Sequence, residues 1–185
     1  YAKGFPEDAE KCLLKSIEYL ERIHEKLLRT TAHGCLAMVY FDIGNYIKSK
    51  DHYEKVGWLM AHSNVLPSWV RWAKVGSARA QVMSNQKNVD INILYEIPSL
   101  NKIKVCEGWI ARDIGEVLMH VDDRHMPDAL VWIGKAIEAD STNGMRWQLA
   151  LDHALYANWY KKKGDPSGAK DQLATAIGIF RECGS

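Results

Sequence analysis

Two histidines and two aspartates are clustered in one short segment of the chain, at His120, Asp122, Asp123 and His125. Imidazole nitrogens and carboxylate oxygens are zinc ligands, so these residue types could suggest a metal. A zinc site needs ligands that converge into a closed shell, whereas an acidic turn with a solvated histidine makes no such demand. We therefore interpret the segment as an acidic turn and expect neither a metal nor another cofactor.

Catalytic chemistry has no local motif to support it. The chain lacks the spacing of a phosphate-binding loop, a nucleophile elbow or a paired-carboxylate site. His24-Glu25 is not followed by a second histidine four positions after the first, so there is no zincin motif. The run Lys161-Lys162-Lys163 could contact phosphate, but cations near a helix C-terminus are already favoured by the helix dipole. We expect no catalytic residues and no enzyme activity.

Trp109 and Arg112 lie one helical turn apart and have the composition of a protein-interface hot spot. Two interpretations stay open. In the first, both side chains face a partner. In the second, Trp109 packs between neighbouring hairpins and Arg112 pairs with Glu116 four residues later.

The charge balance argues against nucleic acid as a partner. Lysine and arginine number 24 against 23 aspartates and glutamates, the two signs are interspersed, and the formal net charge is +1. Binding to a phosphate backbone requires a positive stripe, and none is visible. The apolar runs are also shorter than the roughly 18 residues that a membrane span needs, so we expect no membrane insertion.

The cysteines and the start of the chain suggest where the protein works. Cys12, Cys35, Cys106 and Cys183 are far apart and no pair has CxxC spacing, which favours reduced thiols in a cytoplasmic protein. Residues 1–8 lack the basic start and apolar core of a secretory signal. Because the sequence does not begin with methionine, we expect it to be a fragment of a larger protein.

A repeat of about 40 residues organises the sequence. Small residues that follow an apolar residue recur at Ala37, Gly76, Gly115 and Ala157, with spacings of 39, 39 and 42. A second series recurs every 40 residues, at Ser49, Val89, Ala129 and Ala169. Small residues in an apolar stripe let two helices approach closely, so both series predict helical hairpins.

The turn signals between these stripes set the expected helices. They lie near 6–24, 28–42, 46–61, 67–84, 88–97, 101–121, 127–140, 145–163 and 166–183. We expect a lone helix at 6–24 followed by hairpins at 28–61, 67–97, 101–140 and 145–183, all in one helical-repeat domain over 1–185. The segment 89–94 alternates like a strand, but the repeat places a helix there.

The first and last hairpins carry a family pattern, in which a Leu-small pair is followed by an aromatic, a glycine, and then small and large residues in turn. It reads Leu36, Ala37, Tyr40, Gly44, Tyr46, Ser49, Tyr53 and Val56, and again Tyr156, Ala157, Tyr160, Gly164, Ala169, Leu173 and Ala176. This pattern resembles the tetratricopeptide repeat (TPR), whose usual period is 34 residues. The resemblance implies an all-α, right-handed α-α superhelix, a TPR-like solenoid of about nine antiparallel helices with an unusually long repeat.

A narrower likeness covers roughly residues 85–184. The segments 108–116, 136–140, 143–145 and 179–184 are similar to the C-terminal helical repeats of large bacterial signalling ATPases, some of which carry an adenylate or guanylate cyclase domain. In such proteins the repeats form a sensory or partner-binding arm. No ATPase or cyclase motif lies within this chain.

In TPR-like solenoids the first helix of each hairpin lines a concave groove. Position by position, the resemblance places these residues in it: Met38, Phe41, Asp42, Val70, Ser77, Gln81, Trp109, Arg112, Glu116, His120, Leu151, Asn158 and Lys162. Family members that grip a C-terminal carboxylate use Lys and Asn at set groove positions. The matching positions hold Gly34, Ala73, Arg112, Ala154, Met38, Ser77, Glu116 and Asn158. Only Arg112 and Asn158 are suitable, and they belong to different repeats, so we expect no carboxylate clamp.

The leading functional hypothesis is therefore a non-catalytic scaffold for protein–protein interaction, serving as the regulatory arm of a larger signalling protein. Its partner would be a protein or peptide, another domain of the same polypeptide, or a second copy. The alternative is a small-molecule sensor with a ligand inside the superhelix, because seven tryptophans could line such a pocket.

Overall fold

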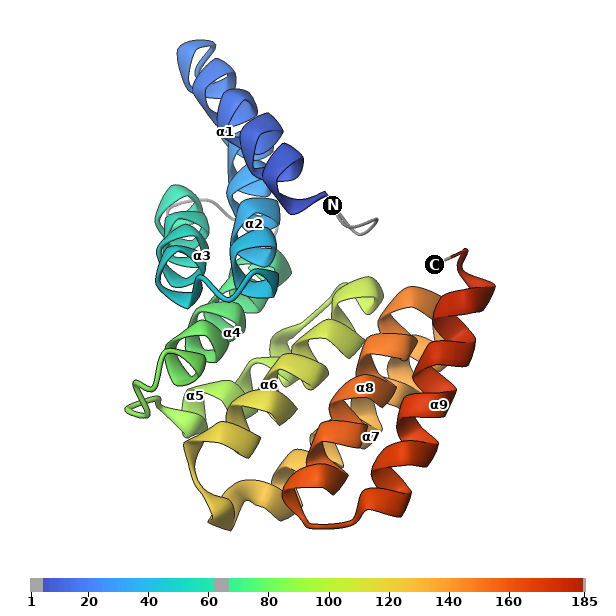
Figure 1. The fold of residues 1–185 in the computed structure, drawn as a ribbon. Coiled ribbons are helices and arrows are strands. Elements are labelled where there is room, and N and C mark those ends of the chain that lie inside the picture. Colours follow the sequence, from blue (N-terminus) through green and yellow to red (C-terminus); the bar gives the residue numbers. More distant parts are fainter. Residues whose placement is uncertain (1–4, 62–66, 185) are drawn as a thin grey trace. The chain divides into compact units, whose positions relative to one another are not determined.

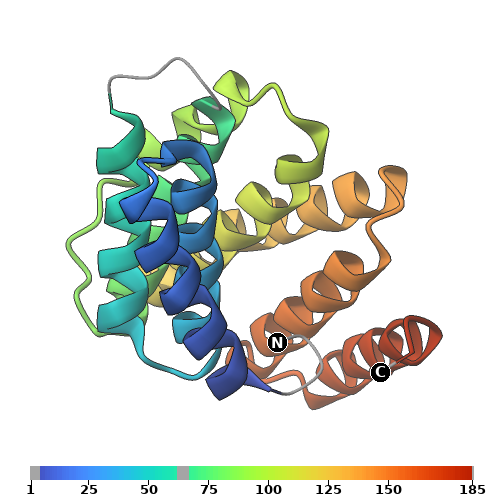
Figure 2. The same cartoon turned by 90° about the horizontal axis from the view of Figure 1, so that it is seen from above.

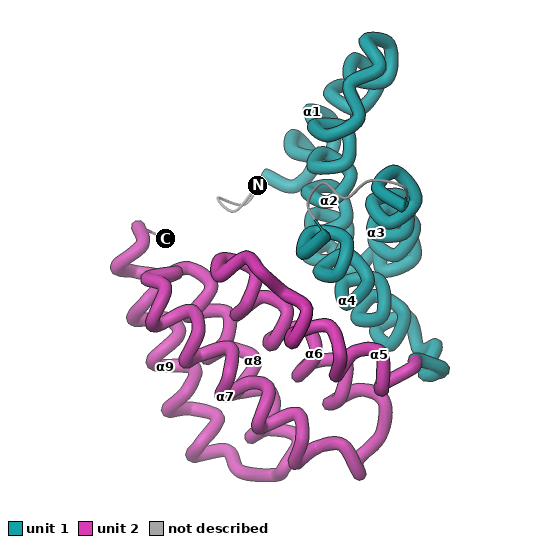
Figure 3. The backbone as a smooth tube through the Cα atoms, turned by 180° about the vertical axis from the view of Figure 1, so that it is seen from behind, with its two compact units in different colours: residues 1–89 teal, residues 90–185 magenta. Residues whose placement is uncertain are grey.

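The computed structural model describes residues 5–61 and 67–184, and over these ranges the chain consists of helices joined by turns and short irregular segments (Figure 1). The all-α fold class is confirmed. The chain divides into two compact units, residues 1–89 and 90–185 (Figure 3). Within the described residues no helix is long and apolar enough to span a membrane. The connection expected at 62–66 lies outside them.

The described residues of unit 1 form four helices, which are α1 (Pro6–Arg22), α2 (Lys26–Asp42), α3 (Tyr46–Met60) and α4 (Pro67–Met83). Pro6 is in the first turn of α1, where backbone amides have no hydrogen-bond partner within the helix. Proline suits this position because it has no amide hydrogen. Gly44 ends α2 with a φ of 78°, a left-handed conformation that glycine adopts without steric cost. The side chain of Asn45 then accepts a hydrogen bond from the Lys48 amide at 3.3 Å and caps α3.

Unit 2 contains five α-helices, which are α5 (Ile91–Glu96), α6 (Glu107–Val121), α7 (Met126–Thr142), α8 (Arg146–Lys162) and α9 (Pro166–Glu182). Three single 3₁₀ turns complete it, at Pro98–Leu100, Lys104–Cys106 and Asp123–His125. Helices α8 and α9 pack side by side and antiparallel (Figures 1 and 2).

The largest differences from the sequence prediction are at the starts of two helices. The helix expected at 88–97 spans only Ile91–Glu96, because Asp90 caps the amides of Asn92 and Ile93 and so fixes where it begins. The helix expected at 101–121 begins at Glu107. Before it, the Asn101 side chain accepts from the Ile103 amide and donates to the Ile103 carbonyl, which holds this segment in a turn. The expected hairpin 67–97 spans the boundary between the two units. Both this hairpin and the expected single domain over 1–185 therefore stay predictions.

Three small repeat positions of unit 1, Ala37, Ser49 and Gly76, lie where helices approach one another, whereas Val89 lies outside any helix, between α4 and α5. The Ser49 hydroxyl donates to the Ala37 carbonyl at 2.8 Å, which joins α3 to α2. The Tyr53 ring occupies the space that a side chain on Gly76 would fill, and it meets the Trp72 ring edge-on at 5.2 Å. Each small residue therefore receives an aromatic or polar group from the neighbouring helix.

Unit 2 repeats this arrangement between α6 and α7. Ile114, Ile133 and Ala129 are fully buried there. A Cβ added to Gly115 would lie 3.1 Å from Ile133 Cγ1 and 3.3 Å from the Ala129 carbonyl oxygen. The backbone of α7 limits how far this contact can relax, so only a small residue fits at the crossing.

We expect Gly115→Leu to lower the free energy of unfolding by about 1–3 kcal/mol, because the added side chain overpacks this crossing. Urea denaturation monitored by circular dichroism measures the loss. Gly134→Leu on α7 is the matched control, since nothing lies within 4 Å of a Cβ built there. Equal stability of the two variants would show that α6 and α7 are packed differently.

Candidate binding surface

In unit 1 the groove positions predicted from the repeat lie on α2 and α4. Asp42 is exposed, and Met38, Val70, Ser77 and Gln81 are partly buried. Phe41 is only 8% exposed, and the Arg79 guanidinium lies over its ring at 3.7 Å from the centroid. This cation–π contact links α4 to α2, so the Phe41 ring is occupied within the unit.

In unit 2 the predicted positions lie on α6 and α8. Trp109, Glu116 and His120 on α6 are partly buried, as is Leu151 on α8, while Asn158 and Lys162 on α8 are exposed. We call these six residues the α6–α8 surface. The Lys162 ammonium donates to the Met119 carbonyl at 2.7 Å, so α8 satisfies a backbone acceptor in the last turn of α6. His120 Nδ1 contacts the Glu116 carbonyl at 2.9 Å.

Arg112 lies in the interface between these two helices. Only 7% of it is exposed. Its Nη1 donates to Gln148 Oε1 at 2.8 Å and to Asp152 Oδ1 at 3.2 Å, both on α8. The side chain therefore connects neighbouring repeats, and we leave it out of the α6–α8 surface.

Three buried aspartates surround Arg112, and sequence reasoning missed all of them. Asp113, Asp140 and Asp152 are 2%, 0% and 0% exposed. Desolvation raises the pKa of Asp152 to about 8, and a hydrogen bond with Asp140 contributes in the same direction while Arg112 opposes it. Desolvation also raises the pKa of Asp140. A signal was present, because Asp152 falls on the same helical stripe as the buried Leu149 and Leu155.

A buried histidine pair joins α2 to α3 and was also missed. His33 Nδ1 and His52 Nδ1 lie 2.9 Å apart, and the rings are 8% and 9% exposed. Desolvation lowers the pKa of each to about 4, and the positive charge of Lys55 adds to the effect on both. At neutral pH both rings are uncharged, so one Nδ1–H can donate to the other Nδ1.

The acidic turn at residues 120–125 makes only local interactions. Asp122 accepts hydrogen bonds from the amide and side chain of Arg124, which lowers the pKa of its carboxyl. His125 Nδ1 lies 3.7 Å from Asp128 Oδ2. No group of three or more metal-ligating side chains is found among the residues that the structure describes.

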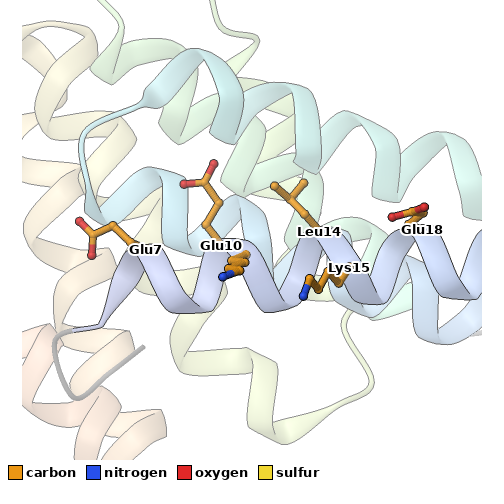
Figure 4. A pocket seen from close by; sticks show the side chains of 6 residues that line it. Glu7, Glu10, Leu14, Lys15 and Glu18 are labelled. Carbon is orange, nitrogen blue, oxygen red and sulfur yellow. The ribbon is translucent and has the colours of Figure 1, made fainter.

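A hollow of about 390 Å³ lies along α1 in unit 1 (Figure 4). Its lining includes Glu7, Glu10, Lys11, Leu14, Lys15 and Glu18. Charged side chains of both signs alternate here with one leucine. The six lining residues named here all lie on α1, so the hollow is open to solvent and does not enclose a ligand as small-molecule sites usually do.

Comparison with known proteins identifies the fold but gives no sequence relative. No protein-family model and no curated protein matches the chain. Among solved structures, a putative kinesin light chain of Podospora anserina with nearly identical TPR-like repeats superposes with a TM-score of 0.58 at 13% identity. The match covers 98% of this chain and 90% of that one. The chain therefore has the fold of a TPR-like helical-repeat protein.

Proposed function

We propose that the chain is a non-catalytic scaffold that binds a protein or peptide, and that the α6–α8 surface of unit 2 is where it does so. The observation that carries the proposal is the arrangement of these two helices. Helix α6 packs on α7 and α8 packs on α7 and α9, and the six residues, which include an aromatic, an acid, an imidazole, an amide and a lysine, are at exposed or half-buried positions of α6 and α8. An apolar centre with polar groups around it is typical of protein interfaces.

Two finer parts of the proposal rest on the sequence. The resemblance over residues 85–184 supports a role as a regulatory arm of a larger signalling protein. Four unpaired cysteines support a cytoplasmic location. The partner could be a separate protein, another domain of the same polypeptide or a second copy.

The tryptophans favour the scaffold over a small-molecule sensor. Trp72 is packed against Tyr53, Trp147 meets Phe180 at 4.7 Å, and Trp159 donates to the Met126 carbonyl at 2.9 Å. Trp58, in contrast, is 76% exposed. Thermal melting of the chain with a panel of metabolites separates the two hypotheses, because a ligand of the native state must raise the melting temperature.

The binding surface can be tested with peptides selected from a display library against the whole chain. We expect Asn158→Trp to weaken the selected peptides at least tenfold in calorimetry, since the bulky ring would cover the α6–α8 surface. Glu138→Trp, at an exposed position of α7, is the matched control and should bind like the unmodified chain. If both variants retain full affinity, the peptides bind elsewhere and the surface assignment is wrong.

A further inference from the structure

The carboxyl groups of Asp140 on α7 and Asp152 on α8 are both completely buried. If both carboxyls were ionised, three of their oxygens, Asp140 Oδ1 and Oδ2 and Asp152 Oδ2, would have no hydrogen-bond donor among the described residues. Buried carboxylates without donors are strongly disfavoured, because they lose hydration and gain nothing in return. The two carboxyls do hydrogen-bond to each other once one of them carries a proton, which then serves as the donor.

The local charge balance leads to the same conclusion. Arg112 contacts this pair, with its Nη1 3.2 Å from Asp152 Oδ1. Asp140 and Asp152 thus face one guanidinium, whose Nε also lies 4.0 Å from Asp113 Oδ1. Ionisation of both Asp140 and Asp152 would place two negative charges beside this single cation in the interior of unit 2, and retaining one proton removes that excess.

The backbone of α6 is shaped to admit this pair. The Asp140 carboxyl occupies the space where a side chain on Gly108 would be, in the first turn of α6. Any larger residue at 108 would expel the carboxyl from its position. Three helices therefore meet around the acid pair, with Gly108 and Arg112 from α6, Asp140 from α7 and Asp152 from α8.

We propose that Asp140 and Asp152 hold one shared proton in the folded chain, and that its loss in mildly alkaline solution loosens the junction of α6, α7 and α8. Unit 2 then contains a pH-sensitive device among the helices that carry the α6–α8 surface. This inference does not depend on what that surface binds. It requires only that ionising the second carboxyl of the Asp140–Asp152 pair, in the interior of unit 2, costs free energy.

The sign of the pH effect follows from the direction of the shift. The pKa of Asp152 is raised by folding, so the folded chain holds a proton that the unfolded chain has released. The contribution of this pair to stability is therefore most favourable below the unfolded pKa and falls as the pH rises towards the folded pKa, by up to about tenfold in the folding equilibrium constant per pH unit. Helix α9 also packs on α8. On α9, Gln172 bonds His153 and Glu182 pairs with Arg146 at the exposed end of α8.

Carboxyl-carbon NMR of the whole chain with labelled aspartate tests the proton directly. We expect one aspartate carboxyl to remain protonated at pH 7 and to titrate near pH 8, and this transition to be absent from Asp152→Asn. If every aspartate carboxyl titrates below pH 5, the proposal is overturned. The measurement on the unmodified chain stands even if a variant fails to fold.

Thermal melting between pH 6 and pH 9 tests the consequence. The unmodified chain should lose several degrees of melting temperature as the pH rises, whereas Asp152→Asn, whose amide replaces the protonated acid, should lose much less. Asp171→Asn, at an exposed position of α9, is the matched control and should follow the unmodified chain. An Asp152→Asn variant with the original pH slope would contradict the shared proton.

Discussion

Replacing Arg112 with methionine is expected to cost about 3–5 kcal/mol of unfolding free energy at pH 7.5, the largest loss from any single substitution considered for this chain. Methionine keeps the length of the side chain but removes the guanidinium that contacts Gln148 and Asp152. The Asp152 carboxyl then loses the cation that contacts it. Breaking a buried ion pair from one side is costly for this reason, even where the intact pair contributes little by itself.

The same substitution should cost less in acid. As the pH falls, the buried aspartates take up protons and the uncompensated charge disappears, so the difference between Arg112→Met and the unmodified chain should shrink between pH 7.5 and pH 5. Urea titrations at the two pH values measure it. Arg124→Met removes an exposed arginine that pairs with Asp122, and it should leave the unfolding midpoint unchanged. An equally small effect of both variants would show that Arg112 is not compensating buried charge.

The repeat could be predicted from the sequence because its key positions have one physical solution. Only a small residue fits where Tyr53 covers Gly76 or where Ile133 meets Gly115, so these members of the series mark helix crossings, whereas Val89 lies outside any helix. Glycine turns such as Gly44 and Gly164 likewise show where helices end, since both have positive φ. Helix crossings and glycine turns of this kind can therefore be predicted from the local sequence.

The buried polar groups could not be predicted in the same way. Arg112 and Asp152 are 40 residues apart, and nothing near either residue indicates its partner. Arginine, aspartate and histidine are usually exposed, so Arg112 was assigned to a groove, and Asp140 and His52 were not selected at all. Their position on an apolar helical stripe was the available signal. The exact bounds of α5 and α6 depended on the Asp90 cap and on the turn that Asn101 forms with Ile103, which propensity alone does not resolve.

The histidine pair should make unit 1 sensitive to acid. The folded rings of His33 and His52 titrate at a pKa of about 4, whereas an unfolded histidine titrates near 6.5. Between these values the unfolded state binds more protons, so the free energy of unfolding falls as the pH is lowered through this window. The shift of each ring corresponds to about 3 kcal/mol, most of which should be lost by pH 4. Protonation of both rings would also replace the Nδ1–Nδ1 hydrogen bond by two donors that repel each other.

Chemical denaturation between pH 4 and pH 7 measures the number of protons taken up on unfolding, and His52→Asn should reduce it by about one. The asparagine amide can still donate to His33 Nδ1, so the hydrogen bond to α2 has a replacement while one titrating group is removed. His24→Asn is the matched control, because His24 is exposed and its φ of 57° suits asparagine well. That variant should keep the full pH dependence. If His52→Asn keeps it too, the acid sensitivity arises elsewhere, and the buried pair does not couple the packing of α2 and α3 to pH.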